Sequence, residues 1–200
     1  MPTNNNVSLF GNSSIKTKVM KSRSNIIQKA ILDFKKTKKI NVDLFKQSPS
    51  EYIVFLALTE CFGINNVLYQ YGLHPYDRRY PYVCDFYIKS KDLFIELNGH
   101  YSHGNHWFDS NNHDDVLRKK HLILSAESKN LHSVDVWTNI DLIKKDKACS
   151  ENLNYLVFWD GSVEHKNKKI IPNLKDFYLW LYDYKGDYDK FIHDYPQNTY

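Results

Sequence analysis

The stretch that decides the fold of this chain is residues 81–103, PYVCDFYIKSKDLFIELNGHYSH. Two runs of apolar and aromatic residues, 82–88 and 93–97, are separated by the short polar segment 89–92. Strand-forming runs joined by such a short polar segment predict a β-hairpin. We therefore expect two adjacent antiparallel strands at the centre of the protein.

Each strand of the expected hairpin carries one carboxylate, Asp85 in the first and Glu96 in the second. A carboxylate among apolar strand residues is costly to desolvate unless a cation or a hydrogen-bond partner meets it. Oxygen ligands from adjacent strands suit Mg²⁺, which keeps several waters and takes further contacts from substrate phosphates. The sequence therefore predicts that Asp85 and Glu96 hold Mg²⁺, for which Mn²⁺ can substitute. The alternative to a metal site is that Arg78 or Arg79 pairs with Asp85 and Glu96 in a structural network.

The segment after the second strand, residues 98–103, supplies a glycine exit and two histidines, His100 and His103. A neutral histidine near a bound ion can accept a proton from an attacking water molecule. This segment is therefore a candidate source of a general base.

The spacing Asp85-x10-Glu96-x-Asn98 resembles the core of the PD-(D/E)xK nucleases, which usually have lysine in place of Asn98. The continuation Asn98-Gly99-x-x-x-His103 is similar to the very-short-patch-repair endonucleases and to the EDxHD homing endonucleases, which are often found in phage-like genomes. The resemblance implies a restriction-endonuclease-like core and metal-dependent hydrolysis of DNA phosphodiester bonds. It implies that Asp85 is the central metal ligand, that Glu96 or the Leu97 carbonyl completes the inner shell, and that His103 is the general base.

The amide of Asn98 is a departure from the family pattern, because it cannot supply the positive charge of a lysine. We expect either that His103 and a basic residue elsewhere take over the role of that lysine, or that nuclease activity is weakened. Asn98 would then orient the phosphate or the attacking water. A nuclease-like fold that binds DNA or a protein partner without cutting is the alternative function.

Two further acidic positions are ambiguous. Residues 48–51, SPSE, predict a helix start in which Ser48 is the N-cap and Glu51 completes a capping box. The resemblance places an acidic residue of the first helix near the metal, so Glu51 is a candidate for both roles. For the later acidic residue of the EDxHD pattern there are three candidates, of which the last two also fit the first turn of a helix: Asp109, Asp114 and Asp115.

Basic residues supply the expected contacts to nucleic acid. Arg78 and Arg79 can grip a phosphate or pair with Asp77 or Glu51. The patch at residues 118–120 (Arg118, Lys119 and Lys120) can position the phosphate backbone or lie simply in solvent.

The positive charge of the chain is concentrated at its start. Residues 1–48 hold ten Lys and Arg against two Asp, whereas residues 49–140 hold eight against eleven acidic residues and residues 141–200 nine against ten. A basic arm beside an acidic region suits a polyanion, so we expect DNA as the partner. No membrane-spanning run or secretory signal is recognisable, which predicts an intracellular protein, in the cytoplasm or, if viral, in the host-cell cytoplasm. The oligomeric state stays open, with a dimer as one option.

The order of the expected elements predicts an α/β (α+β) fold with a mixed sheet, a central hairpin and flanking helices. We expect helices at 48–61, 114–129 and 141–151, and further strands at 66–71, 134–137 and 154–159. The predicted organisation is a basic, partly helical arm at 1–47, a nuclease core at 48–160, and an aromatic-rich helical extension at 161–200 that packs on the core.

Overall fold

The computed structural model describes residues 36–37, 49–72, 77–99, 103–125, 128–160, 163–166 and 169–200. Almost all of the predicted basic arm, the predicted N-cap Ser48 and the candidate base His100 lie outside these residues. The predictions made for them are therefore not addressed by the structure.

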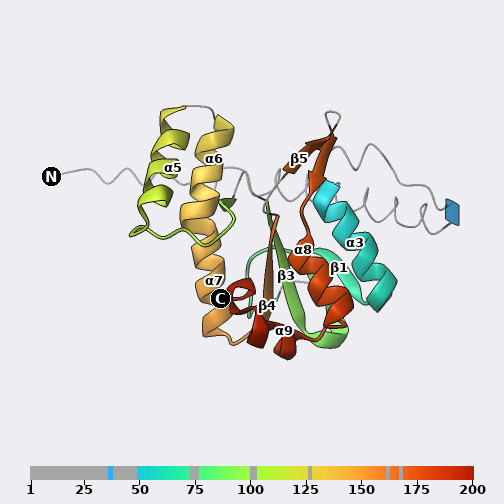
Figure 1. The fold of residues 1–200 in the computed structure, drawn as a ribbon. Helices are drawn as coiled ribbons and strands as arrows, with labels where there is room; N and C mark the ends of the chain where they lie inside the picture. Colours follow the sequence, from blue (N-terminus) through green and yellow to red (C-terminus); the bar gives the residue numbers. More distant parts are fainter. Residues whose placement is uncertain are drawn as a thin grey trace.

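A four-stranded mixed sheet forms the centre of the described fold (Figure 1). Its spatial order is β1 (Val67–Tyr71), β2 (Cys84–Ile88), β3 (Leu93–Gly99) and β4 (Asn154–Asp160). The predicted hairpin is confirmed, because β2 and β3 are antiparallel neighbours with Phe86 opposite Ile95. The short 3₁₀ helix η1 (Lys89–Lys91) and Asp92, with a left-handed φ of 45°, form the turn.

The fourth strand runs parallel to β3, so the chain must cross over between them. The crossover is helical and contains α5 (His113–Leu124), α6 (Ser128–Asp135), the π-helical turn η2 (Val136–Ile140) and α7 (Asp141–Ser150). The predicted mixed sheet with a central hairpin and flanking helices is thus confirmed.

The predicted strand at residues 134–137 is wrong, because this segment is helical, at the junction of α6 and η2. The sequence VDVW alternates apolar and polar residues as a strand does. However, Val134 and Trp137 are both buried, and residues three apart lie on one face of a helix. A short apolar pattern fits both the two-residue period of a strand and the 3.6-residue period of a helix. Here the packing of the segment decides for the helix.

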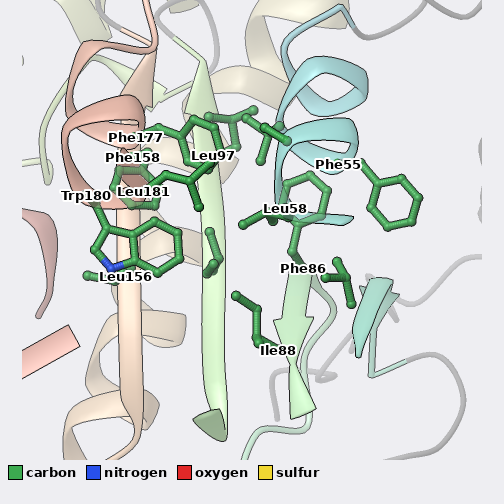
Figure 2. Packing of buried hydrophobic residues seen from close by; sticks show 14 of the residues in the cluster. Phe55, Leu58, Phe86, Ile88, Leu97, Leu156, Phe158, Phe177, Trp180 and Leu181 are labelled. Atoms are coloured by element: carbon green, nitrogen blue, oxygen red, sulfur yellow. The ribbon is translucent and has the colours of Figure 1, made fainter. Parts of the chain in front are cut away.

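One face of the sheet is covered by α3 (Pro49–Phe62) together with α8 (Lys175–Tyr178), the π-helical turn η3 (Leu179–Asp183) and α9 (Tyr188–Asp194). Figure 2 shows side chains from these helices meeting those of the sheet, among them Phe55, Phe86, Phe158, Phe177 and Trp180. Burial of one such side chain contributes roughly 1.5–3 kcal/mol. Phe177, Trp180 and Phe191 of the C-terminal segment therefore belong to the main core.

The opposite face of the sheet packs against α7 (Figure 1). Ala148 of α7 lies there in a second buried cluster with Tyr80, Phe94 and Tyr155. The described chain also contains a separate two-stranded sheet, β5 (Val163–Lys166) and β6 (Lys169–Pro172), and the 3₁₀ helix η4 (Pro196–Asn198). Across the residues that the structure describes, every helix is too short or too polar to cross a membrane.

Candidate functional site

Asp85 lies at the start of β2, beyond Phe86 and Ile95, the last pair of the ladder with β3. Its Oδ2 accepts a hydrogen bond of 2.8 Å from the backbone N–H of Leu97, and its Oδ1 accepts one of 3.4 Å from Gln70 Nε2. The carboxylate therefore substitutes for the missing ladder partner and lies across the end of the hairpin.

Glu96 is buried on β3, with 4% of its surface exposed. Its Oε1 accepts hydrogen bonds from the Tyr80 hydroxyl at 2.9 Å and from Lys144 Nζ at 2.7 Å. Lys144 belongs to α7, and only 17% of its side chain is exposed. The structure thus places a cation beside Glu96, and the expectation that a basic residue elsewhere in the chain compensates for Asn98 stays a prediction.

Sequence reasoning missed Lys144 because it lies 48 positions from Glu96, and no spacing rule links a strand to a helix so far away. One signal in the sequence could have pointed to Lys144, namely its place on the predicted helix 141–151. Residues at positions i, i+3 and i+4 lie on one side of a helix, so Asp141, Lys144 and Lys145 were expected to face the same way.

The charges in this cluster do not balance around Asp85. Burial raises the pKa of Asp85 well above its usual range, and the negative charges of Glu96 and Glu51 raise it further. The cation of Lys144 and the Leu97 N–H lower that pKa, but they do not offset the rise. Burial lowers the pKa of Lys144, but the charges of Glu96 and Asp85 outweigh this effect and the pKa is raised, so Lys144 stays cationic.

Glu51 lies in the first turn of α3, and its Oε2 accepts a hydrogen bond from the Tyr69 hydroxyl. Its charge contributes to the raised pKa of Asp85, so the carboxylate is within electrostatic range of the hairpin site. The charges of Glu51 and Glu96 thus both act on Asp85. The position of Glu51 near a metal ion, which the resemblance implies, stays a prediction. The capping role of Glu51 depends on Ser48, outside the described residues.

His103 follows the end of β3 and contacts a buried carboxylate from the crossover. Its Nδ1 lies 2.6 Å from Oδ2 of Asp141, which is 4% exposed. Asp141 and Lys144 are three residues apart in α7 and so lie on the same helix face. One turn of α7 thus contacts His103 through Asp141 and Glu96 through Lys144.

The acidic residues that the sequence suggested for the loop after His103 have structural roles. Asp115 is buried. Its Oδ2 accepts a hydrogen bond of 2.9 Å from the Asp109 N–H, and its Oδ1 lies 2.8 Å from His106 Nε2. Asp114 lies exposed in the first turn of α5, as its alternative assignment predicted. The acidic residue that contacts His103 is Asp141, which the sequence did not single out. The assignment of Asp109, Asp114 or Asp115 as the later acidic residue of the EDxHD pattern stays a prediction.

Of the two arginines before the hairpin, Arg79 is engaged in ion pairs. Its guanidinium contacts Asp77 at 2.9 Å and Asp92 at 2.6 and 2.8 Å, so the ion-pair alternative describes Arg79. Arg79 thus pairs with Asp77 and Asp92, whereas the carboxylates of Asp85 and Glu96 are contacted by other residues. Arg78 is exposed.

The basic patch on α5 is partly used in packing. The Arg118 guanidinium lies 5.2 Å from the centre of the Trp137 ring, and Lys119 Nζ lies 5.3 Å from that of Phe108. Lys120 is exposed. Arg118 and Lys119 therefore hold the loop after His103 and α5 against η2, while Lys120 faces solvent.

The residues present fit a particular kind of metal site. Among the described residues, no group of three or more His, Cys, Asp or Glu side chains is arranged to enclose a metal ion. The pKa of Asp85 is raised first by burial and then by the charges of Glu96 and Glu51, and a bound cation would favour its ionised form. Two carboxylates with open positions suit Mg²⁺, which completes its shell with water and substrate phosphate.

Two further predicted residues of the site, Leu97 and Asn98, lie on β3. Asn98 is 4% exposed and pairs with Trp159 of β4. Leu97 contributes its N–H to Asp85, and the role of its carbonyl as a metal ligand stays a prediction.

Comparisons with family models, with curated proteins and with solved structures found no match for this chain. The similarity to PD-(D/E)xK nucleases therefore stays a prediction from the motif. The arguments about function that follow depend on the geometry around Asp85, Glu96 and His103.

Proposed function

We propose that this chain is a metal-dependent endonuclease of the PD-(D/E)xK type that hydrolyses phosphodiester bonds in DNA. One observation carries the proposal: a single turn of α7 contacts both Glu96, beside Asp85, and His103. A structural ion pair alone would account for Lys144 and Glu96. It would not account for a second carboxylate of raised pKa at the same place or for a histidine anchored one turn away.

Asp85 and Glu96 would hold Mg²⁺ or Mn²⁺, with the Leu97 carbonyl as a further ligand. When bound, such an ion stabilises charge on the phosphate and lowers the pKa of a water molecule. Lys144 keeps one Glu96 oxygen oriented and adds a fixed positive charge where charge develops on the phosphate. Asn98 would orient the phosphate or the water.

His103 supplies the general base in this proposal. With Asp141 accepting a hydrogen bond from Nδ1–H, the lone pair of the imidazole lies on Nε2, which is the nitrogen that can take a proton from water. Asp141 also stabilises the imidazolium that forms. Contacts to the DNA backbone would come from Arg78, from the patch Arg118, Lys119 and Lys120, and from the basic segment 1–48.

The test is cleavage of supercoiled plasmid in Mg²⁺, Mn²⁺ or EDTA by the wild-type chain and by Asp85→Asn and His103→Ala. Asp146→Asn is the matched control, because Asp146 is an exposed aspartate on α7. We expect metal-dependent nicking by the wild type and by the control, and loss of nicking in both site variants. Equal cleavage by Asp85→Asn and the wild type would refute the proposal.

A nuclease-like fold that binds DNA or a protein without cutting is the second candidate. It is favoured by the engagement of Glu96 with Lys144 and by the absence of a group of three metal-binding side chains among the described residues. Such a binder needs no divalent ion. A thermal midpoint that does not change with Mg²⁺, together with salt-sensitive DNA binding and no cleavage, would favour it.

A further inference from the structure

A pocket of about 310 Å³ lies next to the candidate site, on the α7 side of the sheet. Its walls come from residues 105–107 of the loop after His103, from Trp159 near the end of β4, and from the segment 196–200. This volume is near the lower limit of small-ligand sites, roughly 300–1,000 Å³. The pocket therefore suits one planar group rather than an extended chain.

Three chain connections link this pocket to the candidate site. Trp159 pairs with Asn98 at the end of β3. The loop that carries His103 continues directly into the pocket wall at 105–107. Lys145, which follows Lys144 in α7, has its Nζ 5.4 Å from the centre of the Trp107 ring. The pocket is therefore linked to the candidate site through β3, through the loop after His103 and through α7.

The walls of the pocket are fixed by hydrogen bonds. Trp107 Nε1–H donates to the Thr199 carbonyl at 3.2 Å, and the Thr199 hydroxyl donates to the Tyr155 carbonyl at 2.7 Å. Asn198 Nδ2 donates to the Val157 carbonyl at 3.1 Å, which ties the segment 196–200 to β4. Because these hydrogen bonds already fix the walls, a ligand would bind without losing free energy to the ordering of side chains and loops.

The chemistry of the lining selects the ligand. The Trp107 and Trp159 rings meet edge to face, with centroids 5.1 Å apart, and His106 and Tyr200 add further rings. Gln197 supplies an amide at the rim, which can donate to and accept from a heterocycle. The ammonium of Lys145 adds positive charge beside these rings. A planar aromatic group attached to a phosphate matches this combination.

We propose that this pocket receives one unpaired or everted base of the DNA substrate. The inference depends on the proposed function and makes it narrower: the preferred substrate is DNA that has a base outside the duplex near the scissile phosphate. Stacking of one base on an aromatic side chain contributes about 1–3 kcal/mol, which corresponds to about 5- to 150-fold in affinity.

The test compares two end-labelled duplexes of the same sequence, one fully paired and one with a single bulged base, with dissociation constants measured by fluorescence anisotropy in EDTA. We expect the wild-type chain to prefer the bulged duplex by about 5- to 150-fold. Trp107→Ala should abolish this preference with little change for the paired duplex. The control is Tyr182→Ala, which removes an aromatic ring that is 53% exposed and lies outside the pocket.

A second measurement needs no variant and so stands even if Trp107→Ala fails to fold. The bulged base is replaced by 5-iodouracil, and the light-induced cross-link is mapped by mass spectrometry. A cross-link to Trp107, Trp159 or Tyr200 supports the proposal. A cross-link elsewhere in the chain, or equal binding of both duplexes by the wild type, overturns it.

The two proposals fail in different ways. Metal-dependent cleavage of paired DNA without any preference for the bulge would overturn the base pocket and leave the endonuclease. A bulge preference located at the pocket, with no cleavage in any metal, would overturn the endonuclease and leave a binder of unpaired bases. Absence of DNA binding would overturn both.

Discussion

Lys144 Nζ lies 2.7 Å from Glu96 Oε1, although 48 positions separate the two residues in the chain. The contact joins the crossover helix α7 to the middle of β3, where Glu96 is buried. Each charge depends on the other, because an unpaired buried charge is strongly unfavourable. The stability of the fold and the charge of the candidate site are therefore coupled through this pair.

Replacement of Lys144 by Met should lower the free energy of unfolding by about 3–5 kcal/mol, since it leaves Glu96 buried without its cation. The measurement is urea denaturation at pH 7. Lys147→Met is the matched control, because Lys147 pairs with Glu151 on the surface of the same helix. We expect the control to change stability by no more than about 0.5 kcal/mol. Equal effects of the two variants would contradict a buried pair.

Asp85→Asn should stabilise the metal-free protein at neutral pH. The folded-state pKa of Asp85 is raised, so its protonated form favours the fold below the unfolded pKa of about 3.9, and this contribution is lost as pH rises through the folded value. The stability of the wild type relative to Asp85→Asn should therefore fall as pH increases above about 4. The measurement is urea denaturation of both proteins in EDTA at a series of pH values from about 4 to 8. A relative stability that rises with pH would contradict the sign.

Mg²⁺ should raise the thermal midpoint of the wild type, because a cation bound to the fold relieves the charge around Asp85. Asp85→Asn should show no such rise. Asp146→Asn, the exposed control on α7, should respond as the wild type does. A Mg²⁺ response retained in Asp85→Asn would place the ion elsewhere.

Asp141→Asn should reduce cleavage by about 10²- to 10⁴-fold, since the imidazole of His103 would lose the partner that orients it. KM for DNA should change little, and the pH profile of kcat should shift with the altered basicity of His103. Asp115→Asn is an informative comparison, because Asp115 is also buried and also contacts a histidine, His106. If Asp115→Asn alters the pH profile as Asp141→Asn does, the specific pairing with His103 is not the cause.

Gly104→Ala should destabilise the loop after His103 by about 1–3 kcal/mol. Gly104 has a φ of +72°, and a Cβ there would lie 2.3 Å from the Trp137 ring. Gly99→Ala is the control, because a Cβ at Gly99 meets no atom within 4 Å. Thermal unfolding of both variants provides the comparison, and similar midpoints would show that the loop can move away from Trp137.

The parts of the fold that could be predicted from sequence are those set by short-range patterns. The hairpin at β2 and β3 depends on apolar runs and a turn that are neighbours in the chain, and Asp85 and Glu96 were conspicuous because they interrupt those runs. The apolar and polar pattern of residues 134–137 is compatible with a strand or a helix, so the helical structure of this segment depended on packing that the pattern does not contain.

The parts of the candidate site that could not be predicted are contributed by the crossover. Asp141 and Lys144 carry the charges that complete the contacts of His103 and Glu96, but their position depends on where α7 packs against the sheet. The motif has no lysine at the position of Asn98, and only the three-dimensional arrangement shows that Lys144 places a positive charge beside Glu96.

The parallel pairing of β3 with β4 also has a consequence for synthesis of the protein. Because the connection between these strands carries α7, the hairpin carboxylates leave the ribosome before Lys144, the cation that pairs with Glu96. A nascent chain therefore carries Glu96 for a time without that partner. The proposed site would be complete only once α7 has been synthesised and has packed against the sheet.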